Sequence, residues 1–390
     1  MTLSAKSKWA GLALHLALIT APGAAWLLKA PDVPLFGVEA APAAAPATWE
    51  GWRDGDVQAA IQRDFEGHLG FRGAMVRTDN SLVELAFDAK PGSQVVRGKH
   101  GTLYLIDDIR GYTRRPADLP PLADIAALAD RVADLQADLA RRGTPLVIIM
   151  SPSKTSIYPE DVPARWQLRT SASSEVGASP ANTFRRRLRE RNAPFTDAAT
   201  LLRERFGSDD DARERLFSRL GRHWTFEGAC TVLQVALAGP VPDLTCATTT
   251  AQQRLEQRTD RDLLVLLNRW NLRTVEDGPI PRPNPHPRAS LRPLVVGTSF
   301  SWQIFDWLRG EADGVTHFFY YNVTLVDGTA TKREVIGKIE PSSRTWEGLV
   351  GDRNLFVVEF LETFVTGDYL RAFFVSMQDY LARTPPTASP

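Results

Sequence analysis

The sequence lacks the features that mark several specialised classes of protein. Its 46 Lys and Arg residues are balanced by 46 Asp and Glu residues, so the formal net charge is zero, and it contains no basic run. Proteins that bind nucleic acid usually carry a basic run or patch, so no nucleic-acid partner is expected. The two cysteines do not have the spacing of metal ligands, and neither a zinc site nor a cofactor is expected.

Cysteine is scarce, because Cys230 and Cys246 are the only two in 390 residues. In an exported protein this pair would be able to close a short loop as a disulfide. Two unpaired, buried thiols are the alternative, and the sequence leaves both open.

One long apolar run is present, from Trp9 to Leu28, and it follows Lys6 and Lys8. About 20 apolar residues can span a bilayer as a helix, and lysines before such a run favour a cytoplasmic N-terminus and an exported body. Residues 1–30 are therefore predicted to be an N-terminal transmembrane anchor. A cleaved signal peptide is an alternative, since Ala21 to Ala25 is rich in small residues; a plain buried helix is another.

The rest of the chain is predicted to have three parts. Residues 31–50 are rich in Ala and Pro, as in an extended linker. Residues 51–383 are long enough for one large domain. Residues 384–390 are expected to be a disordered tail.

Helix and strand signals alternate through the body. An apolar stripe from Leu122 to Leu139 predicts an amphipathic helix, and short apolar runs predict buried strands. These runs are 145–150, 294–296 and 355–360. The alternation predicts an α/β fold with a mostly parallel sheet and helices on both faces. The long stretch 248–292 is expected to hold one helix near Leu264 and a loop, and such insertions often border a ligand site.

Ser299 stands where a nucleophile is expected. It follows a predicted strand and a Gly297-Thr298 turn and precedes a predicted helix. Ligands bind at the carboxyl ends of strands in open α/β sheets, and free N–H groups at a helix start can hold an oxyanion. The alternative is that Ser299 only caps the helix. A nucleophilic serine also needs a base, and His223 is the candidate.

Four segments of the chain follow the order of one family's motifs. They are 95–104, Ser151-Pro152-Ser153-Lys154 with Tyr158-Pro159, His223-Trp224 with Gly228-Ala229, and Gly297-Thr298-Ser299-Phe300-Ser301. By these motifs the chain resembles the alginate O-acetyltransferase family of AlgJ/AlgX type, over about residues 52–364. The resemblance implies an SGNH-hydrolase-like α/β/α sandwich.

The resemblance also implies an activity. Ser299 would accept an acetyl group and His223 would act as its base. The acetyl group would come from a membrane-bound O-acyltransferase partner and pass to hydroxyls of an exported, alginate-like polysaccharide. The protein would lie in the inner membrane as a single-pass protein with its catalytic body in the periplasm.

Four further residues are candidates for substrate contact. Lys154 and Tyr158 follow a predicted strand beside the expected cleft, and the alternative for Lys154 is that it only solvates the loop. Trp224 could stack on a sugar ring, and the alternative is that it packs under the histidine. Asn322 follows a strand-like run and is a candidate cleft residue and oxyanion donor.

One position departs from the family's motif. The family's D-x-H aspartate would align with Gly221, and losing an orienting carboxylate can lower the rate by roughly 10⁴-fold. Three explanations are open. Another acid substitutes, with Asp209–Asp211 and Glu214 nearest in sequence; a Ser–His dyad suffices; or the chain binds without catalysing. A polysaccharide acetyl esterase using Ser299 and a non-catalytic scaffold for the acyltransferase partner are the alternative functions.

Overall fold

The chain forms two compact units in a computed structural model that describes residues 5–37, 48–68, 70–87, 94–112, 120–166, 179–273, 275–339, 346 and 349–384. One unit consists of Met1–Ser93 with Leu264–Arg273, and the other of Gln94–Leu263 with Thr274–Pro390. The expected body of residues 51–383 is thus divided, since its first helices group with the segment Leu264–Arg273.

The first unit is helical. Its helices are α1 (Ala5–Leu27), α2 (Trp49–Asp54), α3 (Asp56–His68) and α4 (Arg72–Phe87). The guanidinium group of Arg77 on α4 donates to the backbone oxygens of Arg269 and Pro34, both at 2.8 Å. Arg77 therefore ties α4 to segments that lie far from it in the sequence.

The apolar run near the N-terminus forms most of α1, which contains Pro22. Within the described part of the chain, no helix is long and apolar enough to cross a membrane. The predicted transmembrane anchor is therefore not confirmed. Residues 38–47 of the expected linker and 385–390 of the expected tail lie outside the described residues.

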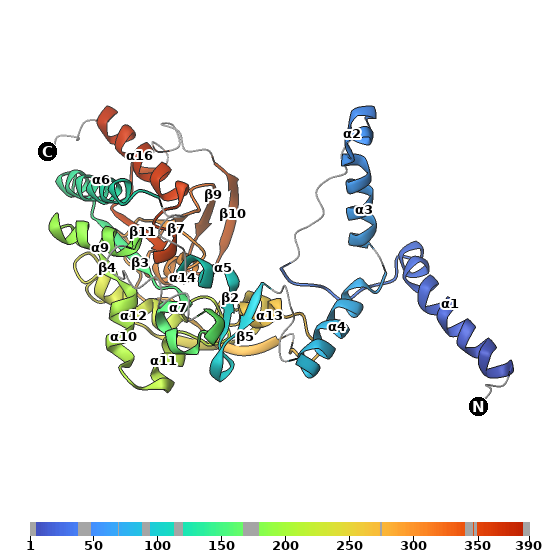
Figure 1. The fold of residues 1–390 in the computed structure, drawn as a ribbon. Coiled ribbons are helices and arrows are strands. Elements are labelled where there is room, and N and C mark those ends of the chain that lie inside the picture. The colour runs from blue at the N-terminus through green and yellow to red at the C-terminus, as the bar shows by residue number, and fades with distance from the viewer. Residues whose placement is uncertain are drawn as a thin grey trace. The chain divides into compact units, whose positions relative to one another are not determined.

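The second unit is built on a seven-stranded sheet with the order β10-β9-β8-β7-β11-β3-β4 (Figure 1). The strands are β3 (Leu146–Ser151), β4 (Thr196–Asp197), β7 (Pro293–Gly297), β8 (Thr316–Tyr320), β9 (Thr324–Gly328), β10 (Arg333–Lys338) and β11 (Leu355–Leu361). The five strands from β8 to β4 pair in parallel, whereas β9 and β10 extend the sheet antiparallel. The α/β prediction is confirmed, with a mixed sheet.

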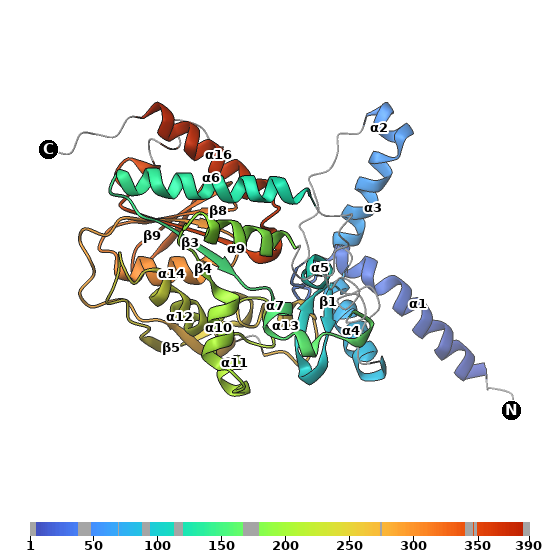
Figure 2. The ribbon, with the colours of Figure 1, turned by 60° about the vertical axis from the view of Figure 1, so that its left-hand side comes forward.

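Helices cover both faces of this sheet (Figure 2). One layer contains α6 (Leu122–Arg141), α9 (Pro180–Glu190) and α16 (Asp368–Arg383); the other contains α10 (Ala198–Phe206), α11 (Asp210–Leu216), α12 (Phe226–Ala236) and α14 (Ser301–Glu311). Side chains alternate between the two faces of a strand, so Val357 of β11 packs in one hydrophobic core and Val358 in the other. This arrangement buries the central strands on both faces.

Two small antiparallel sheets complete the unit. β1 (Val95–Arg97) pairs with β2 (Leu103–Leu105), and β5 (Thr248–Arg254) pairs with β6 (Val275–Pro281). The stretch 248–292 therefore contains a pair of strands that the sequence did not predict. Its expected helix is present as the short α13 (Asp262–Leu266).

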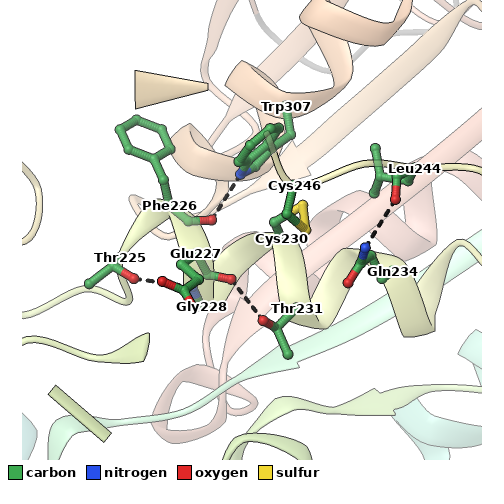
Figure 3. The surroundings of a disulfide bond; sticks show 10 residues. All are labelled: Thr225, Phe226, Glu227, Gly228, Cys230, Thr231, Gln234, Leu244, Cys246 and Trp307. Atoms are coloured by element: carbon green, nitrogen blue, oxygen red, sulfur yellow. Dashed lines mark hydrogen bonds between the residues drawn. A yellow bond between two sulfur atoms is a disulfide. The ribbon is translucent and has the colours of Figure 1, made fainter. Parts of the chain in front are cut away.

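The two cysteines are joined. Cys230 on α12 forms a disulfide with Cys246, with a Cα–Cα distance of 5.7 Å (Figure 3). The amide of Gln234 donates to the carbonyl of Leu244 at 3.1 Å beside the bond, and Thr225 caps the start of α12 by accepting from the Gly228 N–H. The disulfide thus fixes the chain that leaves the C-terminal end of α12.

Candidate active site

Ser299 lies in a tight turn between β7 and α14, here called the nucleophile turn (Gly297–Ser301). A Cβ added at Gly297 would lie 2.7 Å from the backbone oxygen and 2.8 Å from Oε2 of Glu359. Such distances are shorter than a carbon atom tolerates, so only glycine fits at the end of β7. The turn therefore places Ser299 at the carboxyl edge of the sheet, as the sequence predicts.

His223 reaches the nucleophile from a separate segment. Its Nε2 lies 2.7 Å from Ser299 Oγ, and the histidine is buried. The imidazole packs on the ring of Phe300 with a centroid distance of 4.6 Å. The Trp224 indole N–H donates to the backbone oxygen of Phe300 at 3.1 Å. Phe300 thus joins the two candidate catalytic segments beside the serine–histidine contact.

Asp262 stands behind the histidine. Its Oδ2 lies 2.9 Å from His223 Nδ1. The contact is close, but its direction is not that of an aligned hydrogen bond, and Nδ1 has no other acceptor among the described residues. Oδ1 of Asp262 accepts from the N–H groups of Arg222 at 2.7 Å and Leu263 at 3.0 Å. Ser299, His223 and Asp262 therefore stand in the order that an acid–base triad requires.

The acids that lie nearest in sequence are occupied elsewhere. Asp209 accepts from the Ala212 N–H and caps α11. Asp210 accepts from the guanidinium of Arg219 at 2.6 and 2.7 Å, and Glu214 accepts from the Arg219 N–H at 2.9 Å. The expectation that one of these acids stands behind His223 is wrong. The acid comes from the start of α13 instead.

Gly221 makes room for an acid from another segment of the chain. A Cβ at Gly221 would lie 2.6 Å from the backbone oxygen and 2.7 Å from the Cα of Asp260. An aspartate at position 221 would collide with this backbone. The glycine lets the acid segment (Arg258–Asp262) approach His223.

Arg258 holds the acid segment in place. Its Nε and Nη2 donate to the Asp260 carboxylate at 3.1 and 2.6 Å, and its Nη1 donates to the backbone oxygen of Asp277 on β6 at 2.9 Å. Arg258 is buried, so this anchor lies inside the protein. The β5–β6 pair therefore supports the segment that carries Asp262.

Three of the expected substrate contacts are wrong. Lys154, Tyr158 and Trp224 each have a side chain that is 0 % exposed, so none can touch a polysaccharide at the surface. The Lys154 ammonium donates to the backbone oxygen of Ser218, and the Tyr158 hydroxyl donates to that of Phe217 at 2.7 Å. Both side chains therefore support the backbone that leads to Gly221 and His223.

Lys154 is a buried cation in an aromatic setting. Its Nζ lies 5.6 Å from the ring centre of Tyr158 and 5.3 Å from that of Phe217. Burial lowers the pKa of Lys154 to about 7, because removing an ammonium from water disfavours its charged form. Lys154 thus supports the backbone beside the site, and its burial disfavours the charged form.

Asn322 lies next to the nucleophile turn. The Tyr321 N–H donates to the backbone oxygen of Gly297 at 2.8 Å, and Tyr321 and Asn322 both have left-handed backbones, with φ of 49° and 56°. Strained residues of this kind persist where the surrounding structure holds them, often at functional sites. Asn322 is buried, and its Oδ1 has no hydrogen-bond partner in the described structure.

The backbone N–H of Ser299 is the candidate oxyanion donor of the nucleophile turn. Within the described residues, no acceptor is found for the Ser299 N–H, whereas the Thr298 N–H on its other side donates to Glu359 at 2.9 Å. A free N–H beside a nucleophile can stabilise a negative oxygen. No group of three or more His, Cys, Asp or Glu residues placed to hold a metal ion occurs in the described ranges.

A cavity of about 540 Å³ lies beside the acid segment. Thr259, Asp260 and Arg261 line it on one side, and Thr225 and Phe226 line it on another. Neither Ser299 nor His223 faces it. The cavity is therefore separate from the reacting atoms. These are Ser299 Oγ and His223 Nε2, which lie 2.7 Å apart.

Residues 95–279 match a family model described as "SGNH hydrolase-like domain, acetyltransferase AlgX". The chain carries an AlgX-family domain. The matched range contains His223 and Asp262 and ends before Ser299, which the structure adds to the same site. The expected family is thus confirmed for this part of the chain.

Several solved structures are similar to the chain in outline. The O-acetyltransferase domain of Pseudomonas putida AlgJ is 18 % identical with a TM-score of 0.43, covering 72 % of this chain and 99 % of that one. Bacillus cereus PatB1 with a sulfonyl adduct is 10 % identical with a TM-score of 0.44, covering 71 % and 96 %. Pseudomonas aeruginosa AlgX is 13 % identical with a TM-score of 0.40, covering 75 % and 69 %. The comparison with curated proteins gives no match.

Proposed function

We propose that this AlgX-family chain is an O-acetyltransferase that moves an acetyl group through Ser299 onto hydroxyls of an exported polysaccharide. The observation that carries the proposal is the 2.7 Å contact between Ser299 Oγ and His223 Nε2, with Asp262 2.9 Å behind the imidazole. A serine, a base and an orienting acid are the groups that acyl transfer through a covalent intermediate needs.

In the first half-reaction, His223 Nε2 takes the proton of Ser299 as Oγ attacks the carbonyl carbon of the acetyl donor. The tetrahedral intermediate collapses when the bond to the donor's oxygen breaks, and the histidine returns the proton to that leaving oxygen. In the second, a sugar hydroxyl gives its proton to His223 and attacks the acetyl-serine. The bond to Ser299 Oγ then breaks, and the serine is reprotonated.

Asp262 has the role of holding the imidazole in one tautomer. A carboxylate at Nδ1 keeps the proton on that nitrogen and leaves Nε2 free to accept the serine proton. Hydrogen bonds of this kind are often loose before substrate binds and tighten in the complex. The 2.9 Å contact between Asp262 Oδ2 and His223 Nδ1 is of this kind.

The oxyanion of each tetrahedral intermediate would be held by the Ser299 N–H, with the Asn322 amide as a second donor. The first is unengaged, and the second lies on the turn that bonds to Gly297 through Tyr321. Donors that are already aimed at the developing charge are commonly worth 10²–10³-fold in rate each.

The body would work in an oxidising compartment outside the cytoplasm. The Cys230–Cys246 disulfide supports this placement, because disulfides persist mainly in exported proteins. The acetyl donor would be a membrane-bound O-acyltransferase, as the family resemblance implies, and the apolar segment of residues 1–30 would anchor the protein beside it in the inner membrane.

The test is the fate of an acetyl group supplied as an activated ester. We expect acetyl-Ser299 by mass spectrometry in the wild type, none in Ser299→Ala, and transfer to an added acetyl-free polysaccharide. Acetyl-serine that releases only acetate, whatever acceptor is present, would favour the esterase. If no acetyl-serine forms under any condition, the non-catalytic scaffold is the function that remains.

A further inference from the structure

Glu359 is a buried carboxylate beneath the nucleophile. It lies on β11, which pairs with β3 on one side and β7 on the other, and its side chain is 0 % exposed. An isolated charge in such a place is costly. A buried carboxyl group with no cationic partner among the described residues therefore needs hydrogen-bond donors and a structural reason to be there.

The contacts of Glu359 converge on the nucleophile turn. Its Oε2 accepts from the Thr298 N–H at 2.9 Å, the Thr298 hydroxyl at 2.8 Å and the Ser301 hydroxyl at 2.7 Å. Its Oε1 accepts from the hydroxyl of Ser151 at the end of β3. One side chain thus joins β3 and β11 to the turn that follows β7 and carries Ser299.

Each of these partners donates. The Thr298 hydroxyl accepts from the Phe300 N–H at 3.3 Å, which directs its own proton toward Glu359. Burial raises the pKa of Glu359, and the hydrogen bonds from Ser151, Ser301 and Thr298 oppose that rise. The Thr298 N–H and hydroxyl both point a proton at Oε2, so this oxygen is the acceptor that binds the nucleophile turn.

Glu359 also contacts the start of α14, through the hydroxyl of Ser301. The N-cap position of α14 is Phe300, which has no side-chain cap hydrogen bond. Helices usually begin with a residue whose side chain binds the free N–H groups of the first turn, and a negative group there also interacts favourably with the helix dipole. Here the carboxylate arrives from another strand, so it fixes α14 and β7 relative to β11.

We propose that Glu359 is the positioning residue of the nucleophile turn. By binding the Thr298 N–H and the Ser301 hydroxyl, it turns these groups away from the substrate side and leaves the Ser299 N–H as the one amide of the turn that is free for an oxyanion. This rests on the proposed function, because the reaction that it serves is acylation of Ser299.

Glu359→Gln is the decisive variant, because it keeps the shape and removes one accepting oxygen. We expect the single-turnover rate of Ser299 acetylation by an activated ester to fall about 10²-fold, as a misplacement of about 1 Å can cause, with little change in the concentration of ester that half-saturates the rate. Glu311→Gln is the matched control. Glu311 is also buried, at 3 % exposed, and lies at the opposite end of α14, where it accepts from the Asn284 amide and lies 3.7 Å from the Arg288 guanidinium.

A second measurement does not depend on catalysis. Amide hydrogen exchange in the nucleophile turn should be at least 10-fold faster in Glu359→Gln than in the wild type and unchanged in Glu311→Gln. If the wild type does not acetylate Ser299, the proposed function fails while exchange still decides the role of Glu359. If Glu359→Gln does not fold, Ser301→Ala removes one donor and should show the same two effects more weakly. Wild-type acetylation and exchange rates in the folded variant would overturn the proposal.

Discussion

Gly221 lies so close to Asp260 that a Cβ on residue 221 would be 2.6 Å from the Asp260 carbonyl oxygen. In the family's motif this is the aspartate position, and its loss would ordinarily leave the histidine without an orienting acid. The same close approach brings Asp262 to 2.9 Å from His223 Nδ1. The glycine and the displaced acid are therefore two parts of one arrangement, and the missing aspartate is not evidence against catalysis.

Asp262→Asn should lower the rate of acetyl-Ser299 formation by about 10³–10⁴-fold, because an amide can stabilise the wrong histidine tautomer. The measurement is single-turnover acetylation with an activated ester. Asp211→Asn is the control, since this exposed acid lies in the segment that the sequence favoured. Equal rates in Asp262→Asn and wild type would remove Asp262 from the mechanism.

Gly221→Ala should destabilise the protein and slow acetylation together. The added methyl group forces the acid segment away from its place, and overpacking of this kind commonly costs about 1–3 kcal/mol. Urea unfolding measures the free energy of unfolding. Gly239→Ala is the matched control, because a Cβ there meets nothing within 4 Å. A Gly221→Asp protein that is more active than the wild type would show that the family's arrangement is still available.

Local patterns were enough to find the reacting pair. Ser299 follows an apolar strand and a glycine turn, and His223 stands beside a tryptophan, so both could be recognised from neighbouring residues. Asp262 could not, because nothing in its own segment distinguishes it from any acid at a helix start. Its position depends on the missing side chain at Gly221 and on the hydrogen bond from Arg258 to the Asp277 backbone on β6.

Burial explains the other differences between prediction and structure. Lysine is rarely buried, so Lys154 after a strand suggested a surface contact, whereas the backbone oxygen of Ser218 and two aromatic rings surround it. The β5–β6 pair was missed because β5 is polar, Thr248–Arg254, and lacks the apolar run that predicts a strand. Glu359 lies in an apolar strand, and only its contacts with the nucleophile turn disclose its importance.

Replacing both cysteines, Cys230→Ser with Cys246→Ser, should lower the free energy of unfolding by about 3 kcal/mol. The disulfide spans a sequence separation of 16, and closing a loop of about 15 residues has that effect in the chain-entropy account. Thermal unfolding of the wild type with and without reductant should show the same loss of stability when the disulfide is reduced. Because Cys230 and Cys246 do not contact Ser299 in any described interaction, acetylation by the folded variant should stay close to wild type. A variant as stable as the oxidised wild type would contradict the prediction.

The stability of the protein should depend on pH through Lys154. Its pKa is lowered to about 7 by burial, whereas an unfolded lysine keeps a pKa of about 10.4. Between these values the unfolded chain binds more protons than the folded one, so the free energy of unfolding contributed by this group rises with pH. Below about pH 7 both states are protonated and the contribution is constant.

Lys154→Met removes the titration, so the difference in stability between wild type and variant should change in favour of the wild type as the pH rises from 7 to 10. Lys332→Met is the control, since this lysine is exposed and should leave the slope unchanged. Denaturant unfolding at closely spaced pH values decides the matter, because all other ionisable groups are shared and cancel in the difference. Parallel curves for wild type and Lys154→Met would mean that Lys154 keeps its proton throughout, held by the Ser218 carbonyl and the rings of Tyr158 and Phe217.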